Sequence, residues 1–401
     1  MMKWRYEKFG GIVASEDPPF LAMVDRQFMR ELGLAASPLW EAGREEIGVL
    51  SAPTEVHLAA TNVCGAHCPH CYMDAGAPDA GQMDTPTFKR ALRVLAEFGV
   101  FHVALGGGEA LEREDLFELA GYARELGLVP NLTVSGRLLT HDRAAHMARL
   151  FGQVNVSLDG VGVAHEQFRG ERTFATADAA VEMLVKSGVS TGINCVLGAR
   201  NFDGLPDLFA YAKNKQLNEI EFLRFKPAGR ARSLYERERM SYEQNVQLLP
   251  VLQQLSQEHG VQAKIDCSFV PMLCEHNPPR ALLEATATYG CEAGNVLLGI
   301  RSDGTVGGCS FLGRLGLSVF DLPGAWTTHE ALRDLRDWHK RAPEPCASCE
   351  YLDVCKGGCR AVAEYVCGSI DAPDPDCPRV VRAGGQVGSD QNDCPGAGEK
   401  P

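Results

Sequence analysis

The fifteen cysteines are the feature that most limits what this 401-residue chain can fold into, because they gather in two groups. Three stand close together early in the chain, and a dense set occupies its last third. The opening residues MMKWRYEKFGG are charged and aromatic and lack the apolar stretch of a secretory signal. We therefore expect a cytoplasmic protein with reduced thiols, whose clustered cysteines hold metal or perform redox chemistry.

Composition and charge exclude several classes of protein. The chain is 45% hydrophobic and 23% charged, as is ordinary for a globular protein, and its length allows two or three domains. A net charge of −13 without a long basic run argues against binding to nucleic acid or to an anionic membrane. Apolar runs are all shorter than the roughly 18 residues of a membrane span. We expect neither nucleic acid nor membrane as a partner.

Short apolar runs alternate with helical stretches between residues 55 and 265. This alternation predicts an α/β fold with a parallel sheet and right-handed crossovers, in the form of a partial (β/α)6 barrel. In such sheets ligands bind at the carboxyl ends of the strands. The predicted strands are EVHLAAT, FHVALGG, PNLTVSG, QVNVSLDG, TGINCVLG and IEFLRFKP, and the predicted helices span 85–98, 113–126, 140–150, 173–187, 203–215 and 241–258.

Four segments follow from these patterns. Residues 1–50 hold two short strands, in WRYEKFGGIVAS and FLAMVD, and a helix in RQFMRELG. Residues 51–265 form the partial barrel. Residues 266–382 have too little continuous apolar sequence for a core of their own, so metal clusters would supply the cross-links. Residues 383–401 are expected to be a disordered tail.

The early cysteines directly follow the first barrel strand. Cys64, Cys68 and Cys71 form the pattern C-x-x-x-C-x-x-C in CGAHCPHCY. Three thiolates suit a cubane iron–sulfur cluster whose fourth iron stays open for an exogenous molecule. A zinc site completed by His67 or His70 is the alternative.

This loop resembles that of the radical S-adenosylmethionine (radical SAM) superfamily. The resemblance implies a 4Fe–4S cluster whose open iron binds SAM, and reduction of SAM to a 5′-deoxyadenosyl radical that abstracts hydrogen from substrate. Because the radical is generated on SAM, we assign no catalytic side chain. Further residues at strand ends match the family's SAM contacts: Tyr72, Gly107, Gly108, Glu109, Ser135, Ser157, Asp159, Arg169 and Asn194.

The resemblance gives several of these contacts a role. The pair Gly107 and Gly108 would let the backbone approach the SAM amino group, with Glu109 assisting. Ser157 and Arg169 would hold the SAM carboxylate and ribose, and an arginine fork suits a carboxylate. The alternative for Arg169 is a surface ion pair with Glu166 or Glu171. Ser135 and Asn194 would lie near the ribose.

The later cysteines resemble in order and spacing the seven cysteines of the SPASM domain, including the contexts KGGCRA and DPDC. The resemblance implies two auxiliary iron–sulfur clusters, whereas a zinc ribbon is the structural alternative. The outer cluster would be bound by Cys346, Cys349, Cys355 and Cys377, and the inner cluster by Cys291, Cys309 and Cys359. The inner set lacks a fourth ligand: Cys267, Cys274 or Cys367 would supply it, or the site is open or holds a two-iron cluster. Cys195, on an apolar strand, is predicted to be a core thiol.

SPASM enzymes mostly modify ribosomally made peptides, so the resemblance implies an oxidoreductase that decarboxylates or cross-links a side chain of a peptide precursor. Ser310 follows Cys309 where sulfatase-maturing relatives carry an Asp, which argues against that branch. The stretches GGGE and LRFKPAGR are more similar to mycofactocin maturase and pyrroloquinoline-quinone peptide cyclase relatives. Arg224, Lys226 and Arg230 of LRFKPAGR are expected either to receive a substrate carboxylate or to form a charged rim.

The expected partners follow from the same resemblance. Residues 1–33 look like about half of a winged-helix domain that grips a leader peptide as an added strand, so the segment is either a remnant or is complemented by a separate recognition protein. A flavodoxin or ferredoxin would supply electrons. Two other functions stay open: oxidative decarboxylation of a small molecule, such as a tetrapyrrole propionate in haem synthesis, and a non-catalytic iron–sulfur scaffold or electron carrier.

Overall fold

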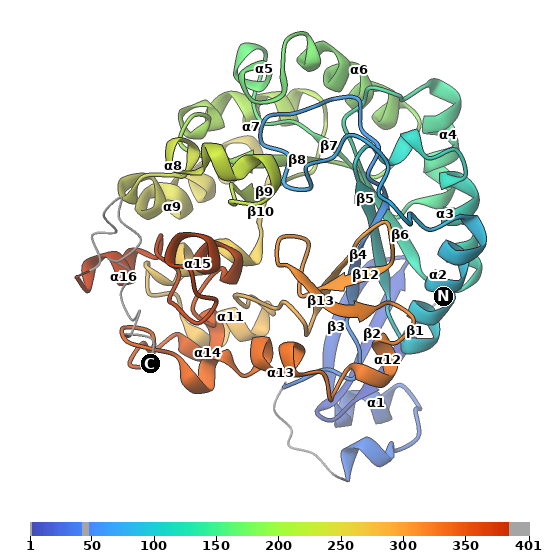
Figure 1. The fold of residues 1–401 in the computed structure, drawn as a ribbon, viewed down its shortest axis with the longest axis vertical. Helices are drawn as coiled ribbons and strands as arrows, with labels where there is room; N and C mark the ends of the chain where they lie inside the picture. Colours follow the sequence, from blue (N-terminus) through green and yellow to red (C-terminus); the bar gives the residue numbers. More distant parts are fainter. Residues whose placement is uncertain (1, 42–47, 385–401) are drawn as a thin grey trace.

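One large sheet organises most of the molecule. The computed structural model describes residues 2–41 and 48–384. Its ten-stranded sheet has the order β10-β9-β8-β7-β6-β5-β4-β11-β12-β13, and Figure 1 shows the barrel helices along its outer side. The expected disorder of 383–401 lies, after residue 384, outside the described residues. None of the described helices is long and apolar enough to cross a bilayer.

The six predicted strands and six predicted helices between residues 55 and 265 are confirmed. Each strand pairs in parallel with the next, as the alternation requires. The strands are β4 Glu55–Thr61, β5 His102–Gly107, β6 Val129–Val134, β7 Val154–Ser157, β8 Thr191–Leu197 and β9 Glu219–Arg224. The helices are α2 Thr85–Phe98, α3 Leu116–Glu125, α4 His141–Leu150, α6 Thr173–Lys186, α7 Leu205–Asn214 and α9 Tyr242–His259. Two shorter helices, α5 Val163–Arg169 and α8 Tyr235–Glu238, stand in the loops after β7 and β9.

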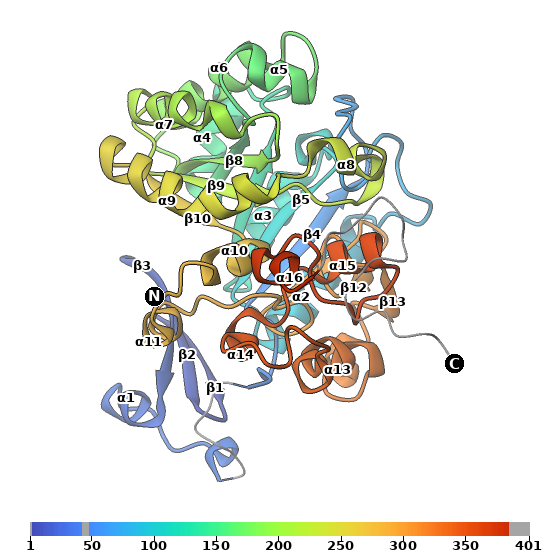
Figure 2. The ribbon, with the colours of Figure 1, turned by 90° about the vertical axis from the view of Figure 1, so that its left-hand side faces the viewer.

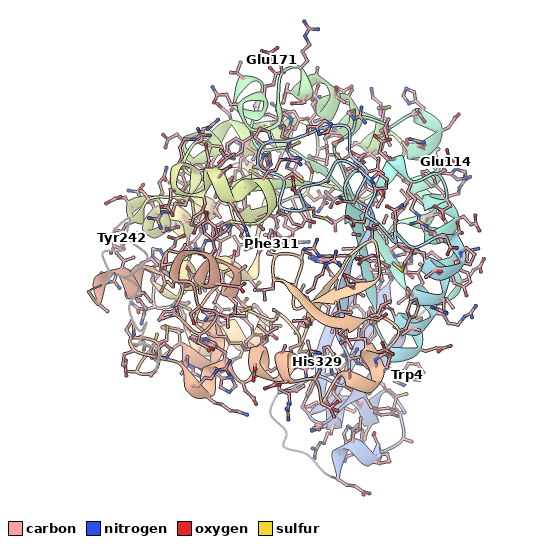
Figure 3. The ribbon with its side chains drawn as sticks, viewed as in Figure 1. Trp4, Glu114, Glu171, Tyr242, Phe311 and His329 are labelled. Atoms are coloured by element: carbon pink, nitrogen blue, oxygen red, sulfur yellow. The ribbon has the colours of Figure 1, made fainter. Side chains whose placement is uncertain are left out.

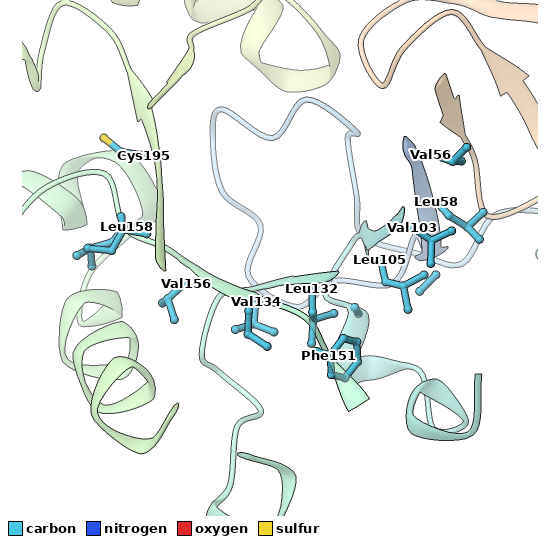
Figure 4. Close-up of a cluster of buried hydrophobic side chains, with 14 of the residues drawn as sticks. Val56, Leu58, Val103, Leu105, Leu132, Val134, Phe151, Val156, Leu158 and Cys195 are labelled. Carbon is cyan, nitrogen blue, oxygen red and sulfur yellow. The ribbon is translucent and has the colours of Figure 1, made fainter. Parts of the chain in front are cut away.

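Alternation along the strands separates an apolar outer face from a polar inner one. On β4, Val56, Leu58 and Ala60 are buried against the helices. Residues of the neighbouring strands continue this layer, as Figure 4 shows for Val103, Leu105, Leu132, Val134 and Val156. Cys195 of β8 lies in the same layer and is 1% exposed, which confirms it as a core thiol. The intervening strand positions therefore face the barrel interior.

The sheet is larger than the six strands predicted. β10 Gln262–Ile265 adds to β9 in parallel, and β11 Leu297–Ile300 adds to β4 in parallel. β12 Thr305–Gly307 and β13 Arg314–Ser318 then continue the sheet in antiparallel fashion. These strands are three to five residues long and rich in glycine, so their sequence gives no clear period. The cysteine-rich segment thus shares the barrel's sheet.

The rest of the cysteine-rich segment is made of short helices. They are α10 Val270–Cys274, α11 Arg280–Ala285, α12 Leu322–Ala325, α13 Glu330–Arg336, α14 Leu352–Cys355, α15 Arg360–Cys367 and α16 Pro378–Arg382. Figure 2 shows α13 to α16 gathered on one side of the barrel beside β12 and β13. α12 and α13 contribute Leu322 and Leu332 to the main core, whereas α10, α14 and α16 pack in small apolar clusters that include cysteines, among them Cys274 with Cys355 and Cys346 with Cys377. The described part of this segment thus packs partly on the barrel core and partly in these small clusters.

The N-terminal segment holds three strands where two were predicted. β1 Lys3–Glu7, β2 Gly10–Glu16 and β3 Pro19–Asp25 form an antiparallel sheet in that order, followed by α1 Arg26–Glu31. A two-residue turn at positions 8–9 splits the stretch that looked like one strand. The Arg5 guanidinium donates to the carbonyls of Ala52, Pro53 and Gly99. This sheet therefore docks at the amino ends of β4 and β5.

Candidate cluster and cofactor site

The loop of Cys64, Cys68 and Cys71 leaves the carboxyl end of β4 and is held by the backbone. The Cys64 amide donates to the Gly76 carbonyl at 3.0 Å, and the Gly76 amide donates to the Asn62 carbonyl at 2.9 Å. Arg230 lies across the loop and donates from Nε to the Cys68 carbonyl at 3.0 Å. All three thiols are partly exposed on this loop. The sulfur atoms are therefore presented at the strand end that the fold reserves for ligands.

Gly107 and Gly108 press the end of β5 against the residues that precede Cys64. The Gly108 amide donates to the Thr61 carbonyl at 2.8 Å, and the Glu109 amide donates to the Val63 carbonyl at 2.9 Å. A Cβ on Gly108 would lie 2.2 Å from the Val63 oxygen, and Gly107 has a φ of +109°. This glycine pair thus lets the backbone after β5 approach the chain that leads into the cysteine loop.

Glu109 carries a buried carboxylate in which only one oxygen is hydrogen-bonded. Its side chain is almost fully buried. Oε2 accepts from the Ser135 amide at 3.0 Å and from the Ser135 hydroxyl, but Oε1 has no hydrogen-bond partner among the described residues. A buried acceptor without a partner costs about 1 to 3 kcal/mol, which a donor from a bound molecule would remove. Ser135 therefore orients Glu109, and Glu109 Oε1 is free to bind a cationic group.

Arg169 pairs with Asp159, and with neither Glu166 nor Glu171. Its Nε donates to Asp159 Oδ2 at 2.6 Å, and the Val196 amide donates to Asp159 Oδ1 at 2.8 Å. Burial opposes ionisation of Asp159, but the Arg169 charge outweighs it and holds the Asp159 pKa below its ordinary value. Arg169 thus keeps its charge close to the cysteine loop.

His70, between the cysteines, lies against this pair in the neutral form. Its Nδ1 donates to the Phe168 carbonyl at 3.0 Å, and Nε2 lies 3.5 Å from Asp159 Oδ2. Burial lowers the His70 pKa to about 4 despite the nearby carboxylate. A neutral ring with its proton on Nδ1 makes no ion pair, so His70 anchors the loop through Phe168. Ser157, at the end of β7, has no hydrogen-bond partner for its hydroxyl in the described part of the chain.

Tyr72 connects the cysteine loop to the cysteine-rich segment. Its ring lies 4.8 Å from that of Phe311, centroid to centroid, and burial raises the Tyr72 pKa to about 12. The Phe311 amide in turn donates to Cys309 Sγ at 3.4 Å. Figure 3 labels Phe311 near the middle of the molecule, where the two parts meet. Tyr72 therefore spans the interval between the first cysteine group and Cys309.

The barrel interior below the loop is polar, and Asn194 belongs to it. Asn194 Oδ1 accepts from Asn155 Nδ2 at 2.6 Å and its Nδ2 donates to Thr133 at 3.2 Å, so both amide groups are engaged by neighbouring strands. On β4, His57 contacts Glu55 at 2.9 Å and Ser310 at 3.0 Å. Partial desolvation by neighbouring groups opposes protonation of His57, but its bond to Glu55 outweighs this and raises its pKa.

Sequence reasoning missed this polar interior. Glu55 and His57 alternate with Val56 and Leu58 in EVHLAAT, and this alternation of polar and apolar residues was the available signal. It was overlooked because the strand was interpreted only as an apolar run. His57 is 42% exposed although it points into the barrel, so the interior is open to solvent there. A polar, solvent-accessible interior next to the cysteine loop is where a substrate would be placed.

The four later cysteines that the resemblance assigns to an outer cluster all line one cavity. Its walls include Cys346, Cys349, Cys355 and Cys377. Cys274 lines the same cavity, and its thiol lies within hydrogen-bonding reach of Cys355. Cys291, Cys309 and Cys359 gather elsewhere, in one apolar cluster. Burial raises the pKa of Cys309 to about 12, and the neighbouring Cys291 adds to the shift.

Arg224 and Lys226 do not face a substrate, contrary to one expectation. Arg224 is buried and donates to Asp374 at 2.6 Å and to Asp376 at 2.7 Å. Lys226 is buried and paired with Asp266. Arg230 binds Asp74 at 2.9 Å in addition to the cysteine loop. Three cations at one strand end thus join the barrel to loops on either side of it.

The donor sets of the three cysteine groups fit iron–sulfur clusters. Thiolates are the ligands of such clusters, and the outer group surrounds a cavity with four of them. No group of three or more His, Cys, Asp or Glu side chains in the described ranges is arranged around a single metal ion. The unpartnered Glu109 oxygen fits the amino group of a bound amino acid such as SAM.

Comparison with known proteins gives three kinds of match. Residues 58–212 match the family described as the radical SAM superfamily. The chain is 30% identical to the mycofactocin maturase MftC of Mycolicibacterium smegmatis, over 82% of this chain and 83% of the relative. It is 29% identical to the AdoMet-dependent heme synthase of Methanosarcina barkeri, over 82% of this chain and 98% of the relative.

Solved structures match the fold along most of the chain. The crystal structure of Streptococcus suis SuiB bound to S-adenosylmethionine has a TM-score of 0.73 at 19% identity, covering 94% of this chain and 98% of SuiB. SuiB bound to its precursor peptide SuiA has a TM-score of 0.68 at 17% identity, covering 90% and 94%. At this identity the likeness concerns the fold alone, an α/β fold with a mainly parallel sheet.

Proposed function

Because the chain belongs to the radical SAM superfamily, we propose that it cleaves SAM reductively and uses the radical to oxidise a side chain of a ribosomally made peptide precursor. The observation that carries the proposal is the meeting of β4 and β5. There the three-cysteine loop lies against Gly107 and Gly108, beside the unpartnered Glu109 oxygen. The protein would work in the cytoplasm.

Cys64, Cys68 and Cys71 would hold the four-iron cluster. When bound, the cluster and SAM supply a 5′-deoxyadenosyl radical, which is the hydrogen-abstracting group of the family. Glu109 Oε1 would accept from the SAM amino group, while Ser135 keeps the carboxylate oriented through Oε2. Ser157, whose hydroxyl is unengaged, and Arg169 would contact the carboxylate and ribose side of SAM.

The later cysteines would hold two auxiliary clusters of the SPASM type. Cys346, Cys349, Cys355 and Cys377 would bind the outer cluster in their shared cavity, which supports this assignment. Cys291, Cys309 and Cys359 would bind the inner one, closer to the barrel. Tyr72 and Phe311 place the first cysteine group and Cys309 on either side of one aromatic contact.

Two observations favour a peptide substrate. The first is the N-terminal sheet, whose β3 is an edge strand able to pair with an added strand. The second is the fold likeness to SuiB, which has been crystallised with its precursor peptide SuiA. A leader peptide would add to β3, or a separate recognition protein would take that role. A flavodoxin or ferredoxin would be the reductant.

The test is anaerobic. The chain is reconstituted with iron and sulfide, reduced, mixed with SAM and assayed chromatographically for deoxyadenosine. Wild type and Cys195→Ala, which lacks only a core thiol, should both produce it, whereas Cys64→Ala should not. Absence of product from wild type with all clusters loaded would favour a non-catalytic iron–sulfur protein instead.

The substrate is tested by intact-mass spectrometry of small peptides encoded beside this protein's gene. We expect a mass loss that fits decarboxylation or removal of hydrogen, and only with SAM present. Unchanged masses for every such peptide would contradict the peptide assignment.

A second candidate is oxidative decarboxylation of a tetrapyrrole propionate. It is favoured by the similarity to the haem synthase of Methanosarcina barkeri, which this chain matches over 98% of its length. Absorption titration with an iron porphyrin separates the two. A saturable spectral change with the porphyrin, together with unchanged peptide masses, would select this candidate.

A further inference from the structure

The inner cysteine group has three members by spacing, and the structure brings a fourth thiol to it. Between Cys291 and Gly304 the sequence has no further cysteine. Cys267, twenty-four residues before Cys291, opens a short 3-10 helix, Cys267–Phe269, directly after β10. This helix contacts β9, the strand that ends in Arg224.

Lys226 ties the residue before Cys267 to the surroundings of Cys309. Its ammonium group pairs with the carboxylate of Asp266. The same nitrogen lies 4.5 Å from the centre of the Phe311 ring. The Phe311 amide donates to Cys309 Sγ at 3.4 Å. One buried cation thus bridges from Asp266 to the Cys309 turn.

Arg224 ties the residue after Cys267 to Cys359. Arg224 Nη1 donates to the Ser268 carbonyl at 3.2 Å and to Asp374 Oδ2 at 2.6 Å. Asp374 Oδ2 also accepts from the Cys359 amide at 2.7 Å. Cys267 is therefore flanked on one side by a link to Cys309 and on the other by a link to Cys359.

The four thiols lie near enough to one another to interact electrostatically. Cys267 interacts with Cys291 and Cys359, and Cys309 interacts with the same two residues.

The other two cysteines that could complete the inner set are placed elsewhere. Cys274 lines the outer cavity and reaches Cys355. Cys367 lies at the end of α15, in a buried cluster with Ala363 and Ala372. Cys359 caps the start of the same helix, so eight residues, about 12 Å of helix, separate the two.

We propose that Cys267 supplies the fourth thiolate of the inner auxiliary cluster, which is then ligated by Cys267, Cys291, Cys309 and Cys359. The proposal rests on the proposed function, since it needs the auxiliary clusters. Its consequence is that every iron of the inner cluster is held by the protein. Such a cluster exchanges electrons and offers no iron to a substrate or to an exogenous ligand.

The test isolates the auxiliary clusters in the full chain. Cys64, Cys68 and Cys71 are all replaced by Ala, so only the later cysteines bind iron. This background should bind about eight irons per chain as two four-iron clusters. Its reduced electron paramagnetic resonance spectrum should not change on addition of cyanide, which binds only to an iron with an open position.

Adding Cys267→Ala to this background opens one iron of the inner cluster. We expect either a spectrum that shifts with cyanide or a loss of about one to four irons per chain. Cys267→Ser, which keeps an oxygen ligand, should retain the iron with a changed spectrum. Cys195→Ala, which removes a thiol buried in the barrel core, is the control, and it should keep both the iron content and the cyanide-insensitive spectrum. Cys274→Ala is measured beside Cys267→Ala as the competing candidate for the fourth ligand.

Two outcomes would overturn the proposal: a background spectrum that already responds to cyanide, or Cys267→Ala spectra and iron content equal to those of the background. If the spectrum of Cys274→Ala changes on addition of cyanide and that of Cys267→Ala does not, the fourth ligand is Cys274. Failure of the proposed function looks different, because the unsubstituted chain would then bind no clusters or produce no deoxyadenosine.

Discussion

Gly106 and Gly108 lie two residues apart at the end of β5, and we expect replacement by alanine to have opposite effects at the two positions. A Cβ at Gly108 would lie 2.2 Å from the Val63 oxygen and 2.8 Å from its carbon. A Cβ at Gly106 would have no atom within 4 Å, and no positive φ opposes it. Gly108→Ala therefore tests the contact between β5 and the cysteine loop, with Gly106→Ala as its matched control.

The cost at Gly108 follows from the geometry. An ordinary contact begins at 3.4 Å, so the two backbones must separate by about 1.2 Å. That movement lengthens the bonds from Gly108 to Thr61 and from Glu109 to Val63, now 2.8 and 2.9 Å, past hydrogen-bonding distance. Overpacking costs about 1 to 3 kcal/mol and each lost bond about 1 kcal/mol. We expect a total of about 3 to 5 kcal/mol, and displacement of Cys64.

Urea unfolding and iron content of the first cluster measure these two effects. The iron content is measured in chains that keep all the later cysteines. Loss of the first cluster then appears as about four irons fewer than in wild type. Gly106→Ala should keep the iron and be neutral or more stable by about 0.4 to 1 kcal/mol. If Gly108→Ala matches Gly106→Ala in both measurements, the argument that this glycine exists for the close approach is wrong.

Three further predictions concern buried charge. Asp159→Asn leaves the Arg169 guanidinium without its carboxylate and should cost about 3 to 5 kcal/mol in urea unfolding, because a lone buried charge is poorly solvated. Arg224→Met leaves Asp374 unpaired between the barrel and the cysteine-rich segment, with a loss of the same size by the same measurement. His165 is buried and its pKa is lowered to about 4, so the unfolded chain takes up a proton below pH 6.5 and the folded chain does not. Wild type should accordingly lose about 2 kcal/mol more than His165→Gln between pH 7 and pH 5.

The control for the Asp159→Asn and Arg224→Met predictions is an ion pair that is exposed on the surface. Lys186→Met removes an ion pair with Glu182 on the surface of α6 and should cost less than about 0.5 kcal/mol. Equal losses for Lys186→Met and Asp159→Asn would refute the claim that burial sets the cost. Parallel pH profiles for wild type and His165→Gln would refute the assignment of the acid sensitivity to His165.

Local signals were enough to place the barrel elements. The helix α2 begins and ends as predicted because its ends are encoded nearby: Asp84 accepts from the Thr87 amide at 2.9 Å, and Gly99 adopts a φ of +99° after the last turn. The cysteine loop was predicted from its spacing and Glu109 from the resemblance to the radical SAM superfamily, and both come together at one sheet edge because β4 and β5 are neighbours. Their shared place at this edge needed only the rule for parallel sheets.

Partners far away in sequence were not predictable in the same way. Arg169 had nearby acidic candidates, but Gly170 ends α5 with a φ of +107° and the side chain turns back to Asp159. Arg224 looked available for a substrate because its carboxylate partner stands 150 residues later. The pairing of β11 with β4 was also missed, since the four residues LLGI of β11 carry no period to detect.

The pairing of β11 with β4 also sets an order for biosynthesis. Thr54, just before β4, bonds to Val296, just before β11, across 242 residues of chain. At the usual rate of about 5 to 20 residues per second, β4 waits about 12 to 50 s for this neighbour to be made. During that time one edge of the strand that leads into the cysteine loop is bare, and a bare edge invites pairing with other chains. A lower level of expression, which keeps fewer incomplete chains present at one time, should therefore raise the yield of soluble protein.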